Sequence, residues 1–191
     1  MPICSRDEIK TDWLNIAPTD NALDKTLDRF IAIAQSEIED MCNQPIVSAS
    51  KTWTAQGTAD RLLPTWYTVP VTVSLVRSRS SYADAFAAIT GTASAVSVDG
   101  VQYLVNTDGW TSLQYEITAT IGYATVPKVI QLCACELVQE MYYASQHAPS
   151  GSRFGVSAIS EGMAGVSMSK TILSMRSRIA PRLAPYRRMV I

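Results

Sequence analysis

Few side chains in this sequence combine the types and spacing that catalysis requires. The single histidine, His147, has no carboxylate or cysteine near it at the spacing of a metal site or a catalytic triad. The many serines have no identifiable activating base, and the motifs G-x-S-x-G, G-x-G-x-x-G, G-x-x-x-x-G-K-[ST] and H-E-x-x-H do not occur. We therefore expect no enzyme activity, no catalytic residue and no bound cofactor.

The four cysteines do not predict a metal site either. Cys133 and Cys135 are two residues apart in a predicted helix, so their side chains point about 200° apart around its axis and cannot both bind one metal ion. Cys4 and Cys42 complete the set, and four cysteines are few for 191 residues. We interpret all four as buried, reduced thiols and expect no metal ion.

Carboxylates could bind Mg²⁺ for nuclease chemistry if several of them converged. Asp24 and Asp28, like the aspartates before them, are instead typical of a helix start and of a solvent-exposed helix face. Glu136 and Glu140 lie one turn apart, but no second carboxylate pair and no histidine joins them. We interpret this pair as part of a solvated or interface stripe, not as a general acid and base.

Charged residues are unevenly distributed along the chain, whose formal net charge is only −1. Residues 1–42 contain nine acids and four bases, whereas residues 170–191 contain six bases and no acid. Five of these six bases are arginines, whose planar guanidinium groups bind carboxylates or phosphates through two hydrogen bonds. Because apolar residues are interleaved with the arginines, the pattern favours a groove in a protein over a phosphate backbone as their partner.

Apolar residues recur at helical spacing near both ends of the chain. A capping-box sequence at residues 5–8 predicts a short helix to about Ile16. Steps of three and four over residues 23–41 predict a second helix of about 22 residues, capped by Thr19 or Asp20. A third helix begins at Pro127 and is apolar over most of its circumference, which is typical of a central helix covered on several sides. A short C-terminal helix is expected to stop at Pro181.

Between the helices the apolar period changes to two, which is typical of strands. Residues 67–75 and 113–121 each alternate apolar and polar side chains and predict two long strands. Pro70 lacks a backbone donor and indicates an edge or a bulge in the first of them. Asp99-Gly100 separates two shorter alternating segments and predicts a β-hairpin. We therefore expect an antiparallel sheet with one face solvated or covered by a partner.

These elements predict an α+β fold with a helical core of two N-terminal helices and a central helix, an inserted antiparallel β-sheet and an extended C-terminal arm. We expect residues 1–191 to form a single domain. Its segments are the N-terminal helices (1–46), the β region (47–124), the central helix (125–147), a Gly- and Ser-rich loop (148–170) and a basic helix and tail (171–191). No apolar run exceeds five residues, so neither a secretion signal nor a membrane-spanning helix is expected.

The order of these elements, together with several short motifs, resembles the head–tail connector (adaptor) proteins of tailed phages. The motifs are Val69-Pro70-Val71, Tyr115-x-Ile117, Gly122-Tyr123, Val126-Pro127, Glu136-Leu137, Ile159-Ser160-Glu161-Gly162 and Leu183-Ala-Pro-Tyr186-Arg187-Arg188. The resemblance covers nearly the whole chain. Residues 78–94 and most of the Gly-rich loop fit no pattern of that family.

The resemblance implies a structural virion protein that is made in the host cytoplasm and lies in the neck between head and tail. Such proteins form a ring, generally of twelve subunits, that binds the portal protein, meets the stopper or tail protein, and extends the channel through which genomic DNA passes without specific binding. No membrane is implied. The resemblance places candidate portal contacts at Arg176, Ile179, Arg182, Tyr186, Arg187 and Arg188.

A ring of this kind uses heterologous contacts, in which one patch meets a different patch on the next subunit. Acidic residues facing a basic region of the neighbour would suit that geometry. The candidate inter-subunit residues are Asp24, Asp28, Glu136 and Glu140. Two alternatives stay open: another neck or tail-completion module with different partners, and a nucleic-acid-binding protein that uses the basic C-terminal tail on phosphates.

Overall fold

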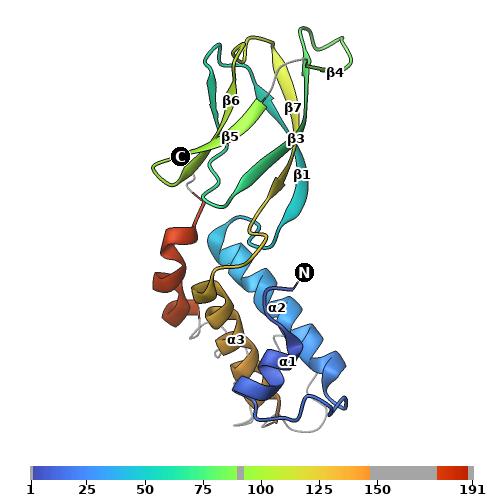
Figure 1. The fold of residues 1–191 in the computed structure, drawn as a ribbon, viewed down its shortest axis with the longest axis vertical. Coiled ribbons are helices and arrows are strands. Elements are labelled where there is room, and N and C mark those ends of the chain that lie inside the picture. The colour runs from blue at the N-terminus through green and yellow to red at the C-terminus, as the bar shows by residue number, and fades with distance from the viewer. Residues whose placement is uncertain (1, 90–92, 147–175, 189–191) are drawn as a thin grey trace, which may run out of the picture. The chain divides into compact units, whose positions relative to one another are not determined.

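The structure is a computed structural model that describes residues 2–89, 93–146 and 176–188 (Figure 1). His147 and the predicted Gly- and Ser-rich loop over 148–170 lie outside the described residues. The described helices and antiparallel sheets confirm the α+β class. The chain divides into two compact units: unit 1 is Met1–Met41 with Val126–Pro185, and unit 2 is Cys42–Thr125 with Tyr186–Ile191. The predicted single domain over 1–191 stays a prediction.

Unit 1 is helical. Its elements are α1 (Arg6–Glu8), the π-helical turn η1 (Ile9–Trp13), α2 (Asp24–Cys42), α3 (Lys128–Gln146), a helix over 176–183 and the 3₁₀ turn η2 (Ala184–Tyr186). The last residue of α2 and the last residue of η2 belong to unit 2. The predicted helix to Ile16 is wrong, because the α-helix widens into a π-helical turn after Glu8. This turn buries the adjacent residues Ile9 and Lys10, which a regular amphipathic helix does not place on one narrow face.

The second helix begins at Asp24, later than the predicted start at Thr19 or Asp20. The reason lies in Asp20, whose carboxylate accepts the backbone amide of Ala22 at 3.0 Å and whose carbonyl accepts a hydrogen bond from Lys10. These bonds hold residues 18–23 in turns rather than in a helix. From Leu27 onward the predicted apolar stripe is buried: Leu27, Phe30, Ile31, Ala34 and Ile38.

α3 supplies the other half of the core of unit 1. Its buried residues are Ile130, Cys133, Ala134, Cys135, Leu137, Val138 and Met141. Three of them are consecutive, so more than one face of the helix is covered, as expected of a central helix. Pro127 precedes the helix and its carbonyl accepts the amides of Ile130 and Gln131, which fits the predicted start.

Unit 2 holds two antiparallel sheets where the sequence pattern predicted one. The first has the order β1 (Ala49–Gln56), β7 (Gln114–Ile121), β3 (Val71–Arg79) and β4 (Ala87–Ala88), and the second has the order β2 (Leu62–Pro64), β6 (Val101–Asn106) and β5 (Ala93–Val98). The hairpin between β5 and β6 is confirmed, with Asp99 and Gly100 both at positive φ. It pairs with β2 rather than with the long strands, a choice of partner that alternation alone does not determine.

The two long strands differ in how well the sequence predicted them. β7 is confirmed, with Tyr115, Ile117, Ala119 and Ile121 all buried on one face. β3 begins only after Pro70, and a bulge interrupts its register between Val73 and Leu75. The bulge turns Val76 inward and leaves Leu75 exposed, so the predicted apolar face is buried at Tyr67, Val69 and Val71 but wrong at Leu75.

Candidate functional site

The basic C-terminal arm, residues 171–191, is the segment for which the sequence predicted a partner. Its first described part, the helix over 176–183, belongs to unit 1. Ile179 and Leu183 lie one turn apart and are both 0% exposed, so the helix packs through this face. The predicted stop at Pro181 is wrong, because burial of Leu183 offsets the backbone hydrogen bond that proline cannot donate.

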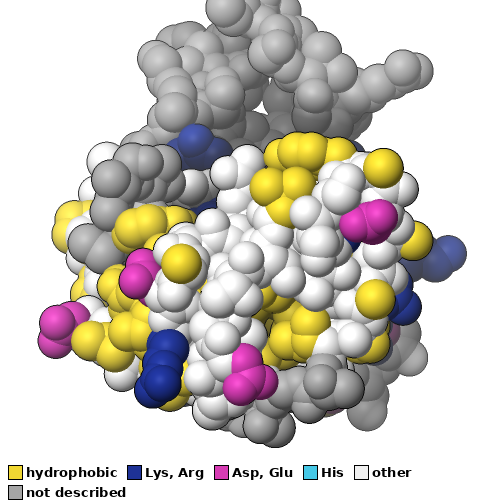
Figure 2. Space-filling model, turned by 90° about the horizontal axis from the view of Figure 1, so that it is seen from above, with side chains coloured by type: hydrophobic (Ala, Val, Ile, Leu, Met, Phe, Trp, Pro, Cys, Tyr) yellow, Lys and Arg dark blue, Asp and Glu magenta, His cyan; other side chains and the backbone are white. Residues whose placement is uncertain are grey.

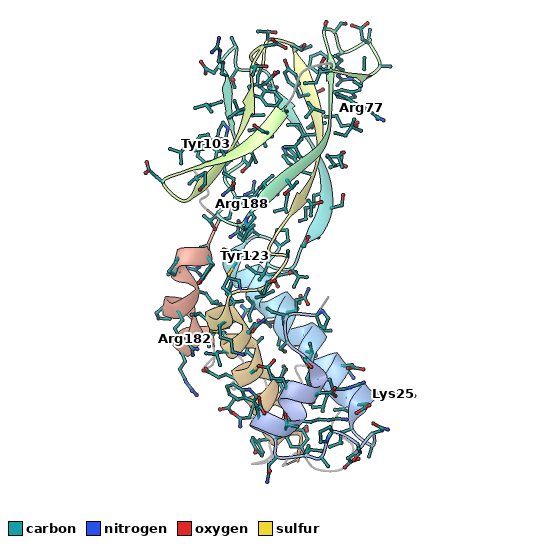
Figure 3. The ribbon with its side chains drawn as sticks, in the orientation of Figure 1. Lys25, Arg77, Tyr103, Tyr123, Arg182 and Arg188 are labelled. Carbon is teal, nitrogen blue, oxygen red and sulfur yellow. The ribbon has the colours of Figure 1, made fainter. Side chains whose placement is uncertain are left out.

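The arginines of this helix bind carboxylates within unit 1. Arg182 Nη1 lies 2.7 Å from Glu136 Oε1, and this hydrogen bond raises the pKa of the Arg182 guanidinium above its usual value (Figure 3). Arg176 contacts Glu37 Oε2 through Nε at 2.6 Å and Nη2 at 2.5 Å. Arg178 Nη1 lies 3.7 Å from Glu140. Two candidate portal contacts and two candidate inter-subunit residues are therefore already engaged inside one subunit.

Asp24 and Asp28, the other candidate inter-subunit residues, hold the N-terminal segment against α2. Arg6 Nη1 lies 3.3 Å from Asp24 and 3.0 Å from Asp28. Lys10 is only 1% exposed, and its ammonium group contacts Asp24 Oδ1 at 2.5 Å. The ammonium group also donates hydrogen bonds to the carbonyls of Asp20 and Pro18, at 2.6 and 3.2 Å. A buried lysine that is satisfied in this way is a structural contact.

The end of the arm lies in unit 2, where side chains from the start of that unit hold it. Gln44 is 5% exposed; its amide nitrogen donates to the Tyr186 carbonyl and to Thr68 Oγ1, and its oxygen accepts the Thr68 amide at 3.0 Å. The Tyr186 ring meets Tyr123 edge-on with centroids 6.4 Å apart. Burial, together with its neighbours Tyr186 and Cys42, raises the pKa of Tyr123.

Arg188 makes several contacts at this end of the arm (Figure 3). Its amide donates to the Cys42 carbonyl at 2.8 Å, and its guanidinium carbon lies 4.4 Å from the centre of the Tyr67 ring. Nη2 also reaches the Thr65 carbonyl at 3.5 Å. Arg187, by contrast, has an exposed side chain. This end of the arm thus places an exposed arginine beside a half-buried one.

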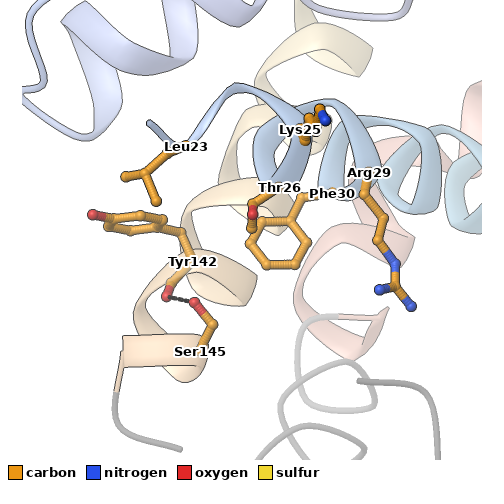
Figure 4. A pocket seen from close by; sticks show the side chains of 7 residues that line it. All are labelled: Leu23, Lys25, Thr26, Arg29, Phe30, Tyr142 and Ser145. Atoms are coloured by element: carbon orange, nitrogen blue, oxygen red, sulfur yellow. Dashed lines mark hydrogen bonds between the residues drawn. The ribbon is translucent and has the colours of Figure 1, made fainter. Parts of the chain in front are cut away.

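A groove of about 480 Å³ opens beside the start of α2 and the end of α3 (Figure 4). Its lining residues are Leu23, Lys25, Thr26, Arg29, Phe30, Tyr142 and Ser145. Phe30 is buried, whereas Lys25 and Arg29 are exposed. The groove therefore combines an aromatic wall with two cationic side chains one helical turn apart.

The four cysteines are all buried and free, as the sequence predicted. A hydrogen bond from the Cys135 thiol lowers the pKa of Cys4, and the same contact with burial raises the pKa of Cys135. Among the described residues, no three His, Cys, Asp or Glu side chains are grouped so as to hold a metal ion. None of the helices in the described ranges is long and apolar enough to span a membrane.

Sequence reasoning missed the residues that hold the arm and the N-terminal segment: Lys10, Gln44 and Tyr67. A lysine among acids is ordinarily a solvated side chain, and nothing in its spacing shows that it is buried. Gln44 and Tyr67 lie more than 100 residues before the arm that they bind. Only the tertiary fold brings them to it.

Comparison with known proteins finds a matching family model and similar folds among solved structures. The family model described as head completion protein matches residues 3–179. No curated protein sequence matches the chain. Among solved structures, a chain from the "neck of empty GTA particle computed with C6 symmetry" is similar with a TM-score of 0.58 and 15% sequence identity, covering 98% of this chain and 91% of that chain. A chain from the "virion of native gene transfer agent (GTA) particle" has a TM-score of 0.57 and 15% identity, covering 100% and 91%.

Proposed function

The chain belongs to the head completion protein family, and we propose that it is a structural protein of the virion neck that joins the portal vertex of the head to the stopper or tail. The observation that carries this proposal is the family match over residues 3–179. It agrees with the resemblance noted in the sequence, and the fold likeness to a chain of a particle neck over 98% of this chain supports it. We propose no catalytic step in this role.

The proposed assembly is a ring of twelve subunits bound to the portal. The C6 symmetry in the description of the related neck supports it, because a twelve-subunit ring is compatible with a sixfold axis. A closed ring of identical subunits needs two different contact patches on each subunit. The chain offers charged side chains of both signs in unit 1 for such patches.

Within the arm, the geometry favours Arg187 as the residue that meets the portal. Its side chain is exposed, whereas the side chains of Arg176, Arg182 and Arg188 are half-buried. Ile179 can contact a partner only if the helix over 176–183 separates from unit 1. The proposed portal contact is therefore centred on Arg187, with Tyr186 and Arg188 fixing its position.

A channel for DNA must avoid holding phosphates. Figure 2 shows one face of the molecule on which uncharged and hydrophobic side chains predominate and Lys, Arg, Asp and Glu are few. On the first sheet of unit 2, Arg77 lies 3.2 Å from Glu116, so these two charges compensate each other. Surfaces of this kind support the proposed passage of DNA without specific binding, because non-specific affinity depends on many unneutralised Lys and Arg side chains.

Electron microscopy of particles from infected cells, with and without a functional gene for this protein, tests the proposal. We expect density for a ring between portal and tail in complete particles, and heads without tails when the protein is absent. Complete, tailed particles formed without the protein would contradict it.

A second experiment tests the arm. Immobilised portal protein of the same virus should retain Arg187→Glu much less than the wild-type protein. Lys51→Glu, which reverses an exposed charge elsewhere in unit 2, is the matched control and should bind normally. Equal retention of both variants would exclude Arg187 as the portal contact while leaving the neck role untouched.

A further inference from the structure

The groove beside α2 has the chemistry of a site for carboxylates. Lys25 and Arg29 stand one turn apart at its rim, and none of the ion pairs recorded among the described residues includes Lys25. Tyr142 and Ser145 close the other side, where the Ser145 hydroxyl donates to the Tyr142 carbonyl at 2.6 Å (Figure 4). Phe30 forms an apolar wall that limits hydration of a bound anion, which strengthens its attraction to Lys25.

The same unit carries carboxylates that its own bases leave available. Asp24 and Asp28 bind Arg6 and Lys10, and Glu8 binds Lys128 at 2.9 Å. Asp7 and Asp12 of the same N-terminal segment are exposed, and no ion pair recorded in the described part of the chain includes either of them. Among the hydrogen bonds recorded for the described residues, Asp12 accepts one, from the neighbouring Thr11 hydroxyl at 2.9 Å.

The bases and the acids lie on different faces of unit 1. Successive residues of a helix are rotated by about 100°, so Lys25 and Arg29 point to a different side of α2 from Asp24 and Asp28. Asp24 and Asp28 face the segment that contains Asp7 and Asp12, since they bind Arg6 and Lys10 of that segment. Two complementary patches on different faces of one subunit are the requirement for a heterologous contact between copies.

We propose that the groove around Lys25 and Arg29 receives Asp7 and Asp12 of a second copy of this chain. This contact rests on the ring proposed above and names its inter-subunit charges. It differs from the sequence-based candidates Asp24, Asp28, Glu136 and Glu140, which are bound within their own subunit. Charge complementarity selects the partner surface and its orientation, while the apolar wall of the groove excludes water from the contact.

Disulfide trapping in assembled particles tests the contact. The double variant Lys25→Cys/Asp12→Cys should form a ladder of covalent oligomers on mild oxidation, with a yield at least about tenfold above that of Lys51→Cys/Asp12→Cys because neighbouring thiols have a high effective concentration. The four native cysteines, which are buried and free in the wild-type protein, are common to both variants and are matched in the comparison. Particles that contain the protein but give no ladder would overturn the contact, whereas particles without the protein would overturn the neck role.

A covalent product that joins the thiol introduced by Lys25→Cys to the portal protein would overturn the contact between copies and assign the groove to the portal.

A charge-swap experiment gives an independent readout that misfolding cannot mimic. Lys25→Glu/Arg29→Glu and Asp7→Lys/Asp12→Lys should each lower incorporation into particles at least about tenfold, since like charges then face each other. Mixed in equal amounts, the two variants should recover incorporation, because every contact in an alternating ring again joins opposite charges. Failure of the mixture, with both variants folded by circular dichroism, contradicts the proposal.

Discussion

Lys10 shows how a single buried charge can fix a chain segment. Its ammonium group forms an ion pair with Asp24 at 2.5 Å and donates hydrogen bonds to the carbonyls of Asp20 and Pro18 at 2.6 and 3.2 Å. Burying an ammonium group without partners costs several kcal/mol, so these contacts must remain together in the folded state. They tie the π-helical turn and the following turns to the start of α2. The segment that carries Asp7 and Asp12 owes its position to this cluster.

Lys10→Met retains the length of the side chain but leaves Asp24 without the nearest of its cationic partners. We expect a loss of about 3 kcal/mol in the free energy of unfolding, the usual cost of breaking a buried ion pair. Urea denaturation followed by circular dichroism measures it. Lys51→Met, at an exposed lysine, should change stability by less than about 0.5 kcal/mol. A Lys10→Met protein as stable as the wild type would show that the cluster contributes no net stability.

The thiol of Cys133 makes stability depend on pH in the alkaline range. Burial raises its pKa above the ordinary value of 9.0, with Arg182 opposing the shift and Glu136 adding to it. The unfolded chain therefore releases this proton at lower pH than the folded protein. The resulting stabilisation is complete below pH 9.0 and is lost as pH rises through the folded-state pKa.

Cys133→Ala removes this dependence. Between pH 8 and pH 10.5, the wild-type protein should lose about 1 kcal/mol more stability than the variant, since each titrating group contributes at most about 1.4 kcal/mol per pH unit. Tyr123, whose pKa is also raised, is present in both proteins and cancels in the comparison. Parallel pH profiles of the two proteins would contradict the assignment to Cys133.

At the scale of elements, the sequence predicted strands best where burial alternates without interruption. β7 lies between β1 and β3 in the first sheet, and every second residue from Tyr115 to Ile121 is buried. A central strand has neighbours on both edges, so its side-chain period directly reports its two faces. β3 reads just as regularly in the sequence, but its bulge between Val73 and Leu75 follows from pairing with β7. The local signal, Pro70, lies before the strand and does not mark this position.

Gly122 ends β7 and cannot be replaced without displacing the backbone beside it. Its φ is +113°, and a Cβ there would lie 2.7 Å from the Val47 carbonyl oxygen. We expect Gly122→Ala to cost about 2–4 kcal/mol of unfolding free energy, as overpacking adds to backbone strain. Gly100→Ala is the matched control: its φ is +79°, but a Cβ meets nothing within 4 Å. The control should cost about 1 kcal/mol. Equal losses in denaturant titrations would exclude the steric part of the argument.

At the scale of the whole molecule, the net charge of −1 averages an acidic start and a basic end, and much of that asymmetry is cancelled by contacts within unit 1. Glu37, Glu136 and Glu140 each bind one arginine of the arm. Engagement of these guanidinium groups by carboxylates makes them poorer phosphate ligands, because each must first leave its partner. The alternative function as a nucleic-acid-binding protein loses support for this reason.

We therefore expect weak DNA binding by the wild-type protein, with a dissociation constant above about 10 μM at 150 mM salt, within the range of non-specific contacts. Replacing Glu37, Glu136 and Glu140 together by glutamine should tighten binding and steepen its salt dependence by about 2–3 in the log–log slope, one increment for each released arginine. Fluorescence anisotropy with a labelled duplex measures both. Submicromolar, salt-sensitive binding by the wild type would restore the nucleic-acid alternative.

The sequence by itself determined the α+β class, the apolar stripe of α2, the start of α3, the strand β7 and the hairpin at Asp99-Gly100, because each depends on local periodicity or turn chemistry. It also carried enough family likeness to indicate a head–tail connector protein, which is consistent with the match to the head completion protein family. Only the tertiary structure decided which charged side chains form ion pairs within the subunit. Arg182 and Glu136 are 46 residues apart, and Lys10 and Asp24 belong to different elements, yet each pair forms an ion pair. Coulomb attraction depends on distance in space, and sequence spacing gives that distance only within a single helix or strand.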